Sequence, residues 1–284
     1  MVPERTVFTR ESILARLRKN IAEGRPILGA GSSVGIVAKS AEAGGADLII
    51  VYSTGRSRIF GLPTTMIGHS NPLTLDMFDE IANVVDDTPI IGGAEAVDPT
   101  YRRLPKLIKA FRDTGFDGLI NFPTVGNRPD FSSSRAHVGQ GFDRELEMVR
   151  LARQQDYLTL AYVWNPEQAR QMAASGVDIN VAHVGWTVGG FSGAGDAAMS
   201  LDQGCERSQE MFDATWKENR EVICLAHGGP LANPEDTKVL YERTDAQGFV
   251  GASSLERIPI EMGIMNAARG FKNQTLRTSA RRTS

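Results

Sequence analysis

The sequence predicts an α/β fold of the (β/α)8 type, a TIM barrel with an N-terminal capping helix. Two observations predict it. Short apolar runs alternate eight times with helix-like segments along the 284 residues, and these runs lack polar alternation, as parallel strands buried on both faces do. We expect a single barrel domain over residues 1–272 and a basic, disordered tail over 273–284.

The eight units follow one another in order. A leading helix at 11–24 is expected to cover the barrel bottom. The expected strands, the last two given with the loops that end them, are 25–31, 46–53, 88–96, 117–125, 157–164, 178–186, 222–230 and 248–257. Helices are expected after them at 33–46, 73–86, 99–115, 142–155, 165–176, 200–219, 233–244 and 257–271.

Residues that favour helix ends support these boundaries. Asn165 and Asn233 each precede a proline, which places Asn at the N-cap and Pro at the first helical position, and Ser200 with Gln203 forms a capping box. Glycines suited to closing a helix follow four of the segments: Gly24, Gly44, Gly115 and Gly176. Two loops, 126–141 and 187–199, exceed ordinary length, and the second is rich enough in Gly and Ala to serve as a mobile flap.

Composition excludes several classes of function. The formal net charge is −3, with 31 basic and 34 acidic residues mixed along the chain, so no nucleic-acid footprint is present. No segment reaches the roughly 18 apolar residues of a membrane span. Cys205 and Cys224 lack metal or disulfide spacing. We therefore expect a cytoplasmic protein with reduced thiols and a small-molecule partner.

A doubly wound sheet is the rival fold, because Gly29 and Gly31 follow the first strand. The dinucleotide fingerprint needs a third glycine where Val34 stands, and the second strand ends at Ser53 without an acid for a ribose. We expect no nicotinamide or flavin cofactor.

The barrel fold indicates where chemistry would occur, since catalytic groups lie at the C-terminal ends of the strands. His183 and His227 end the sixth and seventh strands, and Glu95 ends the third. Either histidine could move a proton or bind a metal, or could only hydrogen-bond a backbone group. Glu95 could take a proton, bind a divalent metal such as Mg, Mn or Zn, or form a salt bridge to Arg56. Asp98, before Pro99, is more simply an N-cap.

Small residues at the last two strand ends favour an anion site. Backbone amides and hydroxyls there can face an anion, although glycines also serve tight turns. From this region and the other strand ends, the predicted substrate-binding residues are Ser32, Arg56, Asn121, Gly228, Gly229, Gly251, Ser253 and Ser254. Arg58 is the alternative to Arg56.

Several segments together resemble a known family. NFPTVG at 121–126, NVAHVGWTVGG at 180–190, LAHGGP at 225–230 and GASSLER at 251–257 resemble the phosphoenolpyruvate hydrolase-like TIM-barrel family, which also forms the C-terminal domain of Tm-1-like proteins. The resemblance covers residues 11–272.

The resemblance has chemical implications. The family is similar to the isocitrate lyase and phosphonopyruvate hydrolase superfamily, whose members bind Mg²⁺ and cleave C–C or C–P bonds beside a 2-oxo acid through an enolate-like state. Those enzymes carry an Asp-x-Asp pair after strand three, whereas only Glu95 stands there in this chain.

The expected activity is that of a hydrolase or lyase acting on a small anionic oxo-acid or β-diketone-type substrate. It would cleave a C–C bond, in preference to a C–P or C–O bond. A barrel that binds a phosphorylated metabolite or nucleotide without turnover is the alternative. A phosphosugar isomerase is a third, but no lysine ends a strand. Barrels of this type often self-associate, so we expect a homo-oligomer, for which the apolar stretch 258–265 could serve either as an interface or as core packing.

Overall fold

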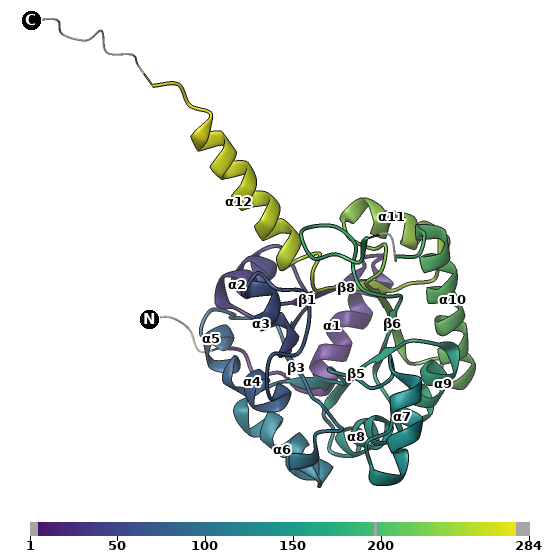
Figure 1. Ribbon diagram of the computed structural model, residues 1–284. Helices are drawn as coiled ribbons and strands as arrows, with labels where there is room; N and C mark the ends of the chain where they lie inside the picture. Colours follow the sequence, from purple (N-terminus) through teal and green to yellow (C-terminus); the bar gives the residue numbers. More distant parts are fainter. Residues whose placement is uncertain (1–4, 196–197, 277–284) are drawn as a thin grey trace, which may run out of the picture.

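A computed structural model describes residues 5–195 and 198–276. It contains a closed barrel of eight parallel strands in sequential order (Figure 1). The strands are β1 (Ile27–Gly31), β2 (Leu48–Val51), β3 (Ile90–Gly93), β4 (Gly118–Ile120), β5 (Leu158–Val163), β6 (Ile179–His183), β7 (Ile223–His227) and β8 (Gly248–Gly251). The predicted TIM barrel is confirmed, and the doubly wound alternative is excluded because β8 pairs with β1.

Helices surround the barrel. They are α2 (Gly35–Ala43), α3 (Thr54–Ile59), α4 (Ser70–Asp76), α5 (Phe78–Ala82), α6 (Leu104–Thr114), α7 (Pro129–Arg135), α8 (Asp143–Gln154), α9 (Pro166–Ala174), α10 (Leu201–Glu218), α11 (Pro234–Arg243) and α12 (Arg257–Lys272), with 3-10 turns η1 (Pro99–Tyr101) and η2 (Ala136–Val138). Among the described residues, no helix is both long and apolar enough to span a membrane.

The predicted helix caps are largely confirmed. Asn165, Asn233 and Ser200 each accept a hydrogen bond from the backbone of their helix's first turn. Gly45, with φ +89°, and not Gly44, with φ −81°, has the left-handed backbone after α2. The cap is displaced by one residue because either glycine of the pair can adopt the conformation.

Two predicted segments differ from the structure. Residues 73–86 do not form one helix: α4 and α5 meet at Met77, whose side chain is fully buried in the core. The long loop 126–141 contains α7 and η2, because Pro129 stands at the first turn of a helix, where its fixed φ is favourable.

The N-terminal helix α1 (Arg10–Ala22) closes the barrel bottom, as predicted. Thr9 caps it in a reciprocal hydrogen-bonded box with Ser12. Its buried side chains, Ile13, Leu14 and Leu17, join the cluster inside the barrel. The interior is therefore a packed core that leaves only the opposite, C-terminal mouth open to ligands.

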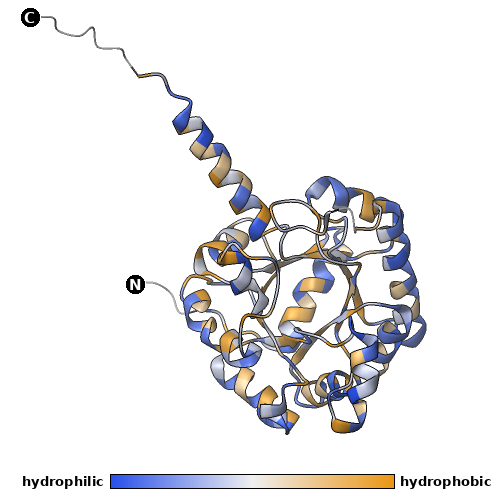
Figure 2. Cartoon of the chain, in the orientation of Figure 1, coloured by the Kyte–Doolittle hydropathy of each residue, from blue (hydrophilic) through white to orange (hydrophobic). Residues whose placement is uncertain are grey.

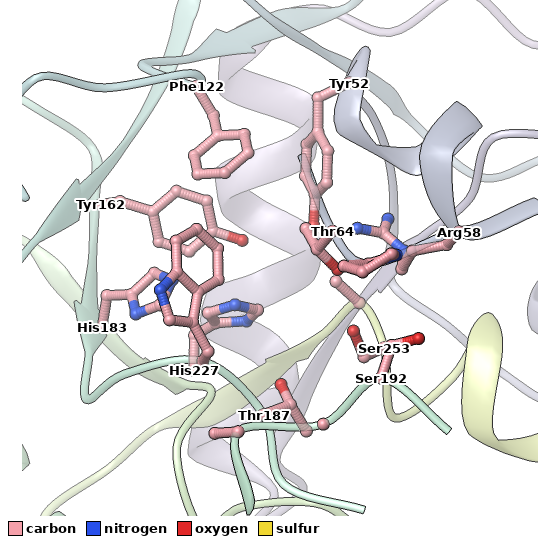
Figure 3. A pocket seen from close by; sticks show the side chains of 15 residues that line it. Tyr52, Arg58, Thr64, Phe122, Tyr162, His183, Thr187, Ser192, His227 and Ser253 are labelled. Carbon is pink, nitrogen blue, oxygen red and sulfur yellow. The ribbon is translucent and has the colours of Figure 1, made fainter. Parts of the chain in front are cut away.

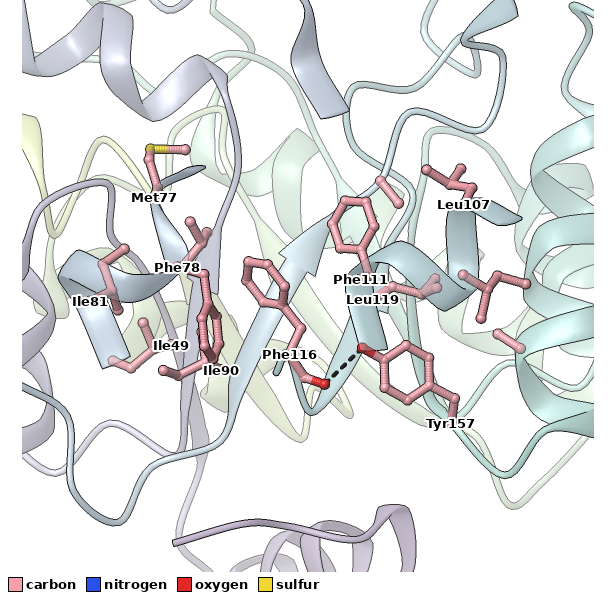
Figure 4. Close-up of a cluster of buried hydrophobic side chains, with 14 of the residues drawn as sticks. Ile49, Met77, Phe78, Ile81, Ile90, Leu107, Phe111, Phe116, Leu119 and Tyr157 are labelled. Atoms are coloured by element: carbon pink, nitrogen blue, oxygen red, sulfur yellow. Dashed lines mark hydrogen bonds between the residues drawn. The ribbon is translucent and has the colours of Figure 1, made fainter. Parts of the chain in front are cut away.

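A second layer of core lies between strands and outer helices. Figure 4 shows one such cluster, in which Phe78, Phe111 and Phe116 pack tilted or edge to face between β3 and the helices around it. The hydroxyl of Tyr157 donates to the backbone oxygen of Phe116 at 2.8 Å. Both cysteines are free, as expected, and both are buried.

The last helix does not follow the pattern. α12 leaves the barrel surface and projects outward, with the described chain ending at its far end (Figure 1). Only Arg257 of its residues is buried. Of the predicted tail 273–284, residues 277–284 lie outside the described part of the chain.

Candidate active site

A cavity of about 230 Å³ opens at the C-terminal mouth of the barrel (Figure 3). Strand ends provide its floor and the loop after β6 covers part of it. The described lining residues are Tyr52, Arg58, Pro63, Thr64, Phe122, Tyr162, His183, Trp186, Thr187, Ser192, Gly193, Ala194, His227, Ala252 and Ser253. Two predicted catalytic histidines therefore meet in one cavity, together with the predicted Ser253.

The barrel register places the two histidines side by side. His183 and His227 are paired residues at the ends of β6 and β7, with ring centroids 4.5 Å apart. Their relative exposures are 2% and 7%. Such burial disfavours the imidazolium form, so both rings are neutral near pH 7.

A backbone carbonyl sets the proton position on His227. Its Nδ1 lies 2.6 Å from the backbone oxygen of Val250. A carbonyl oxygen only accepts, so Nδ1 carries the proton and Nε2 keeps its lone pair. Burial lowers the pKa of His227 to about 4, the bond to Val250 opposes this, and the charge of Arg58 lowers the pKa further. His227 is thus a neutral acceptor in the cavity.

His183 has the opposite tautomer. Its Nδ1 accepts from the backbone N–H of Gly185 at 3.2 Å, so the proton of the neutral ring is on Nε2. Burial, and then the neighbouring His227, hold the pKa of His183 well below its usual range. Trp164 stacks on the ring with centroids 3.7 Å apart and an interplanar angle of 20°. His183 is thus a neutral N–H donor beside the His227 acceptor.

A phenol completes this group of neutral hydrogen-bonding side chains. Tyr162 extends from β5, and its hydroxyl is directed toward the space between Tyr52 and His227 (Figure 3). Among the described residues, this buried hydroxyl has no hydrogen-bond partner. Burial, followed by the nearby Tyr52 hydroxyl, raises the pKa of Tyr162 well above its usual range. Tyr162 is a protonated donor.

Arg58 supplies a fixed positive charge. Its guanidinium Nε and one terminal nitrogen lie 2.7 and 2.6 Å from Oε2 of Glu256, which is itself fully buried. Glu256 also accepts from the backbone N–H of Ser33 at 2.7 Å and from the Ser33 hydroxyl. Burial opposes the charge of Arg58, but the Glu256 carboxylate outweighs it and raises its pKa. Arg58 therefore stays positively charged.

Arg56 and Ser32, two predicted substrate-binding residues, are not among the described residues that line this cavity. Arg56 lies at the periphery, where a guanidinium nitrogen is 3.4 Å from Glu80. Ser32 is buried, and its hydroxyl lies 3.5 Å from the Ala30 carbonyl. The neighbouring residues Ser33 and Arg58 instead both bind the buried Glu256.

Asn121 serves the framework between β4 and β5. Its amide nitrogen donates to the Glu145 carboxylate at 2.5 Å and to the Tyr162 carbonyl at 3.2 Å, and its oxygen accepts from the Tyr162 N–H at 2.7 Å. Asn121 is fully buried. Its amide therefore positions Tyr162 and is not directed at a ligand.

The predicted anion-binding glycines shape turns. Gly228 and Gly229 have φ of +79° and +56°. The N–H of Gly229 donates to the Gly185 carbonyl at 2.7 Å, which ties the turns after β6 and β7 together. Gly251 and Ser254 also lie outside the described cavity lining, so Ser253 is the member of this predicted set that faces the cavity.

Glu95 lies in an adjacent second cavity of about 440 Å³, which shares Thr64, Phe122 and Trp186 with the first. Burial, followed by the Asp98 carboxylate, raises the pKa of Glu95. The structure thus separates Glu95 from the histidine pair.

The donor set around Glu95 does not fit a divalent-cation cage. Both oxygens of Asp98 are engaged: one accepts from the Thr100 N–H at 2.8 Å, as the predicted N-cap does, and the other from Asn71 at 2.9 Å. In the described part of the chain no three His, Cys, Asp or Glu side chains converge on one point. Glu95 alone supplies fewer ligands than the roughly six to eight oxygens of a typical Ca²⁺ cage.

Sequence reasoning missed the residues that hold the site from outside the strand ends. Glu145 and Glu256 are helix-side carboxylates whose partners lie 20 or more positions away in the sequence. No local pattern distinguishes them from exposed glutamates. Tyr52 and Tyr162 can be recognised from the sequence as strand-end residues. Whether their side chains line the cavity depends on which face of each strand points into the barrel.

Comparisons with known proteins agree with this barrel. A family model described as phosphoenolpyruvate hydrolase-like matches residues 12–274. The ToMV susceptible protein tm-1(GCR26) of Solanum lycopersicum is 38% identical over 94% of this chain, and a putative transcriptional regulatory protein, y4pA, of Sinorhizobium fredii is 32% identical over 94%. The chain spans only 36% and 44% of their respective lengths.

The fold also has solved relatives. A phosphonopyruvate hydrolase in complex with oxalate and Mg²⁺ superposes with a TM-score of 0.57 at 16% identity, covering 96% of this chain and 90% of that one. At this identity the likeness concerns the fold. The match to the family model over nearly the whole barrel, with relatives above 30% identity, shows that the chain belongs to the phosphoenolpyruvate hydrolase-like family.

Proposed function

We propose that this chain is a hydrolase or lyase that cleaves a C–C bond, in preference to a C–P or C–O bond, in a small anionic oxo-acid or β-diketone-type substrate. One observation carries the proposal. An imidazole lone pair on His227, two neutral donors on His183 and Tyr162, and the cation Arg58 line the same small cavity. Together these groups supply a base, oxyanion donors and an anion-binding cation, which is what acid–base chemistry on an anionic carbonyl compound uses.

Arg58 and Ser253 would hold the anionic end of the substrate. Two of the five guanidinium N–H donors of Arg58 are directed at Glu256, which fixes the plane of the group and leaves other donors for a carboxylate. Glu256 pairs with the Arg58 guanidinium when no substrate is bound, and this pairing allows Arg58 to be buried at the barrel mouth.

Tyr162 and His183 would stabilise the negative charge that forms on the substrate carbonyl oxygen. In a hydrolytic cleavage, the oxygen of a water molecule attacks the substrate carbonyl carbon while Nε2 of His227 takes a proton from that water. The carbonyl oxygen becomes an alkoxide that accepts hydrogen bonds from Tyr162 and from Nε2–H of His183. Asn121, one of the predicted substrate-binding residues, does not take part because its amide is engaged with Glu145.

Collapse of the alkoxide breaks the C–C bond. The electron pair of that bond passes to the departing carbon as an enolate, and the proton on His227 then moves to that carbon. The products are a carboxylic acid and a shortened carbonyl compound, and one water is consumed. Each of these steps uses side chains of this chain and one water molecule.

The experiment is turnover of a panel of 2-oxo acids and β-diketones, with and without Mg²⁺, Mn²⁺ or Zn²⁺, by wild type and His227→Gln. The control is His137→Gln, which changes an exposed histidine in η2. We expect His227→Gln to lower kcat by about 10²- to 10⁴-fold, the usual contribution of general acid–base catalysis. The control should retain wild-type kcat.

Two outcomes would overturn the proposal. One is activity of His227→Gln equal to that of wild type. The other is ligand-dependent thermal stabilisation by the panel without any turnover, which is the behaviour expected of a barrel that only binds its ligand.

A further inference from the structure

The second cavity enlarges the site at the barrel mouth. It measures about 440 Å³, against about 230 Å³ for the histidine cavity, and Thr64, Phe122 and Trp186 line both. Most of its other described lining residues follow β3 or β4, as Glu95 and Arg128 do. The histidine cavity alone is smaller than the roughly 300 Å³ at which small-molecule sites in proteins begin. The two cavities together are large enough for a substrate that spans both.

The side chains between the two cavities contact the reacting groups. The ring centroid of Phe122 lies 5.3 Å from that of Tyr162, and the ring centroid of Trp186 lies 5.9 Å from that of His183. Trp186 is 48% exposed, so this edge of the site is open to solvent. A substrate whose carbonyl oxygen meets Tyr162 and His183 can therefore extend past Phe122 and Trp186 into the second cavity.

The walls of the second cavity are largely apolar. Val97, Val125 and Phe131 line it together with Phe122 and Trp186. Phe131 is the large apolar residue of α7, a helix that combines hydrophobic and hydrophilic residues (Figure 2). A protein cavity of roughly 150 Å³ already binds benzene. The second cavity therefore has both the volume and the lining for an aromatic ring.

Polar atoms without partners also line the second cavity. Asn71 fixes the main chain of Glu95, because its side chain accepts from the Glu95 N–H at 2.8 Å and donates to the Glu95 carbonyl at 3.1 Å. The Glu95 carboxylate itself has no ion-pair partner in the described part of the chain. Among the described residues, the Thr54 hydroxyl and the Asn127 side-chain oxygen, both buried, have no hydrogen-bond partner.

These atoms indicate which ligand group would fit them. Buried polar atoms without a partner are rare in native proteins, and a ligand can satisfy them. The oxygens of Glu95 and Asn127 accept hydrogen bonds, and the Thr54 hydroxyl donates or accepts. A ligand hydroxyl matches this set because it does both, whereas an ammonium group only donates and a carboxylate would be repelled by Glu95. Arg128, exposed at the edge of the cavity, also disfavours a cation.

We propose that the second cavity binds the acyl arm of the substrate, and that this arm is an apolar, ring-sized group that carries a hydroxyl. The inference rests on the proposed function, which places the substrate carboxylate at Arg58 and the carbonyl under attack beside the histidines. The substrates are then 2,4-dioxo acids of the form R–CO–CH₂–CO–COO⁻, with R in the second cavity. Hydrolysis between the R–CO carbon and the CH₂ carbon consumes one water and releases R–COOH and CH₃–CO–COO⁻.

The test is a series of three such acids in which R is methyl, phenyl or para-hydroxyphenyl. Calorimetry on His227→Gln, which lacks the base and keeps the other lining side chains, gives the dissociation constants, and wild type gives kcat/KM. The phenyl compound should bind at least about 10-fold more tightly than the methyl compound, because it fills the apolar part of the cavity. The hydroxyl should add about 10-fold more, the usual effect of a hydrogen bond to a charged group.

Variants in the His227→Gln background assign these effects to the second cavity. Phe131→Ala should reduce the preference for phenyl over methyl, whereas Val138→Ala, an exposed change in η2, should leave that ratio unaltered. Glu95→Leu should bring the ratio of hydroxyphenyl to phenyl affinity close to one. Asp130→Leu removes an exposed carboxylate of α7 that is not among the described lining residues, and it should retain the ratio. Circular dichroism checks that each variant is folded.

The outcomes separate this inference from the proposed function. Equal dissociation constants across the series, or an undiminished hydroxyl preference in Glu95→Leu, would overturn the role of the second cavity even if wild type hydrolyses all three acids. Graded binding that depends on Phe131 and Glu95, without turnover by wild type, would support the second cavity and overturn the proposed function. Binding of none of the three acids would overturn both.

Discussion

At the scale of single residues, buried carboxylates organise the site without facing it. Glu256 orients Arg58, and Glu145 binds the strand-four end through the Thr124 hydroxyl at 2.7 Å and the Val125 N–H at 2.7 Å. Such groups are costly to bury and are tolerated when their hydrogen bonds are satisfied. For Glu145 the energetic signature is a dependence of stability on pH.

Glu145 should lower stability as the pH rises. Burial raises its pKa to about 7 against an ordinary value of 4.5, despite hydrogen bonds from Thr124, Val125 and Asn121 that oppose the shift. Between these values the native state holds a proton that the unfolded state releases, so the free energy of unfolding falls as the pH increases, by at most about 3 kcal/mol. Urea unfolding from pH 4.5 to 8 measures it.

Glu145→Gln should flatten this pH dependence, because an amide does not titrate. The control is Glu147→Gln on the same helix, where the carboxylate lies at the surface and pairs with Arg150. A profile of Glu145→Gln that falls with pH as steeply as wild type would show that another group is responsible.

At the scale of elements, the turns after β6 and β7 bring the two histidines together. A Cβ at Gly228, where φ is +79°, would lie 2.2 Å from the Gly185 carbonyl oxygen. The close approach of the two turns therefore requires glycine. The sequence identified these glycines, but their backbone geometry assigns them to the turns.

Gly228→Ala should lower the free energy of unfolding by more than 1 kcal/mol, because both the positive φ and the clash oppose a side chain. Gly263→Ala, within α12 where a Cβ would contact nothing within 4 Å, should instead stabilise the chain by about 0.5 to 1 kcal/mol. Thermal unfolding of the two variants provides the comparison. Equal melting temperatures would contradict the assigned role of Gly228.

At the scale of the whole molecule, the barrel is closed at one end by α1 and open at the other. Leu17 of α1 is 1% exposed among the inward side chains of the strands. Because α1 closes the bottom of the barrel, ligands reach the interior from the C-terminal mouth, where the cavity lies.

Leu17→Ala should lower the free energy of unfolding by about 2 to 5 kcal/mol, the cost of a cavity in a packed core. Lys19→Ala, on the exposed side of the same helix, should change it by less than about 0.5 kcal/mol. Chemical denaturation compares the two. A small effect at Leu17 would show that α1 does not contribute to the barrel core.

Local patterns along the chain were enough to predict the barrel, its bottom helix and the strand-end histidines. These follow from local signals, namely apolar runs, helix caps and the rule that parallel strands end together. His183 and His227 could be named because each directly ends such a run.

Which polar groups face the cavity depends on tertiary contacts that local patterns do not reveal. Arg58 and Arg56 differ by two positions, yet one is buried against Glu256 and the other pairs with Glu80 at the periphery. Glu95 lies in the neighbouring cavity, and α12 leaves the wall that its position in the pattern predicts. These outcomes depend on contacts between residues far apart in the sequence, which local patterns do not encode.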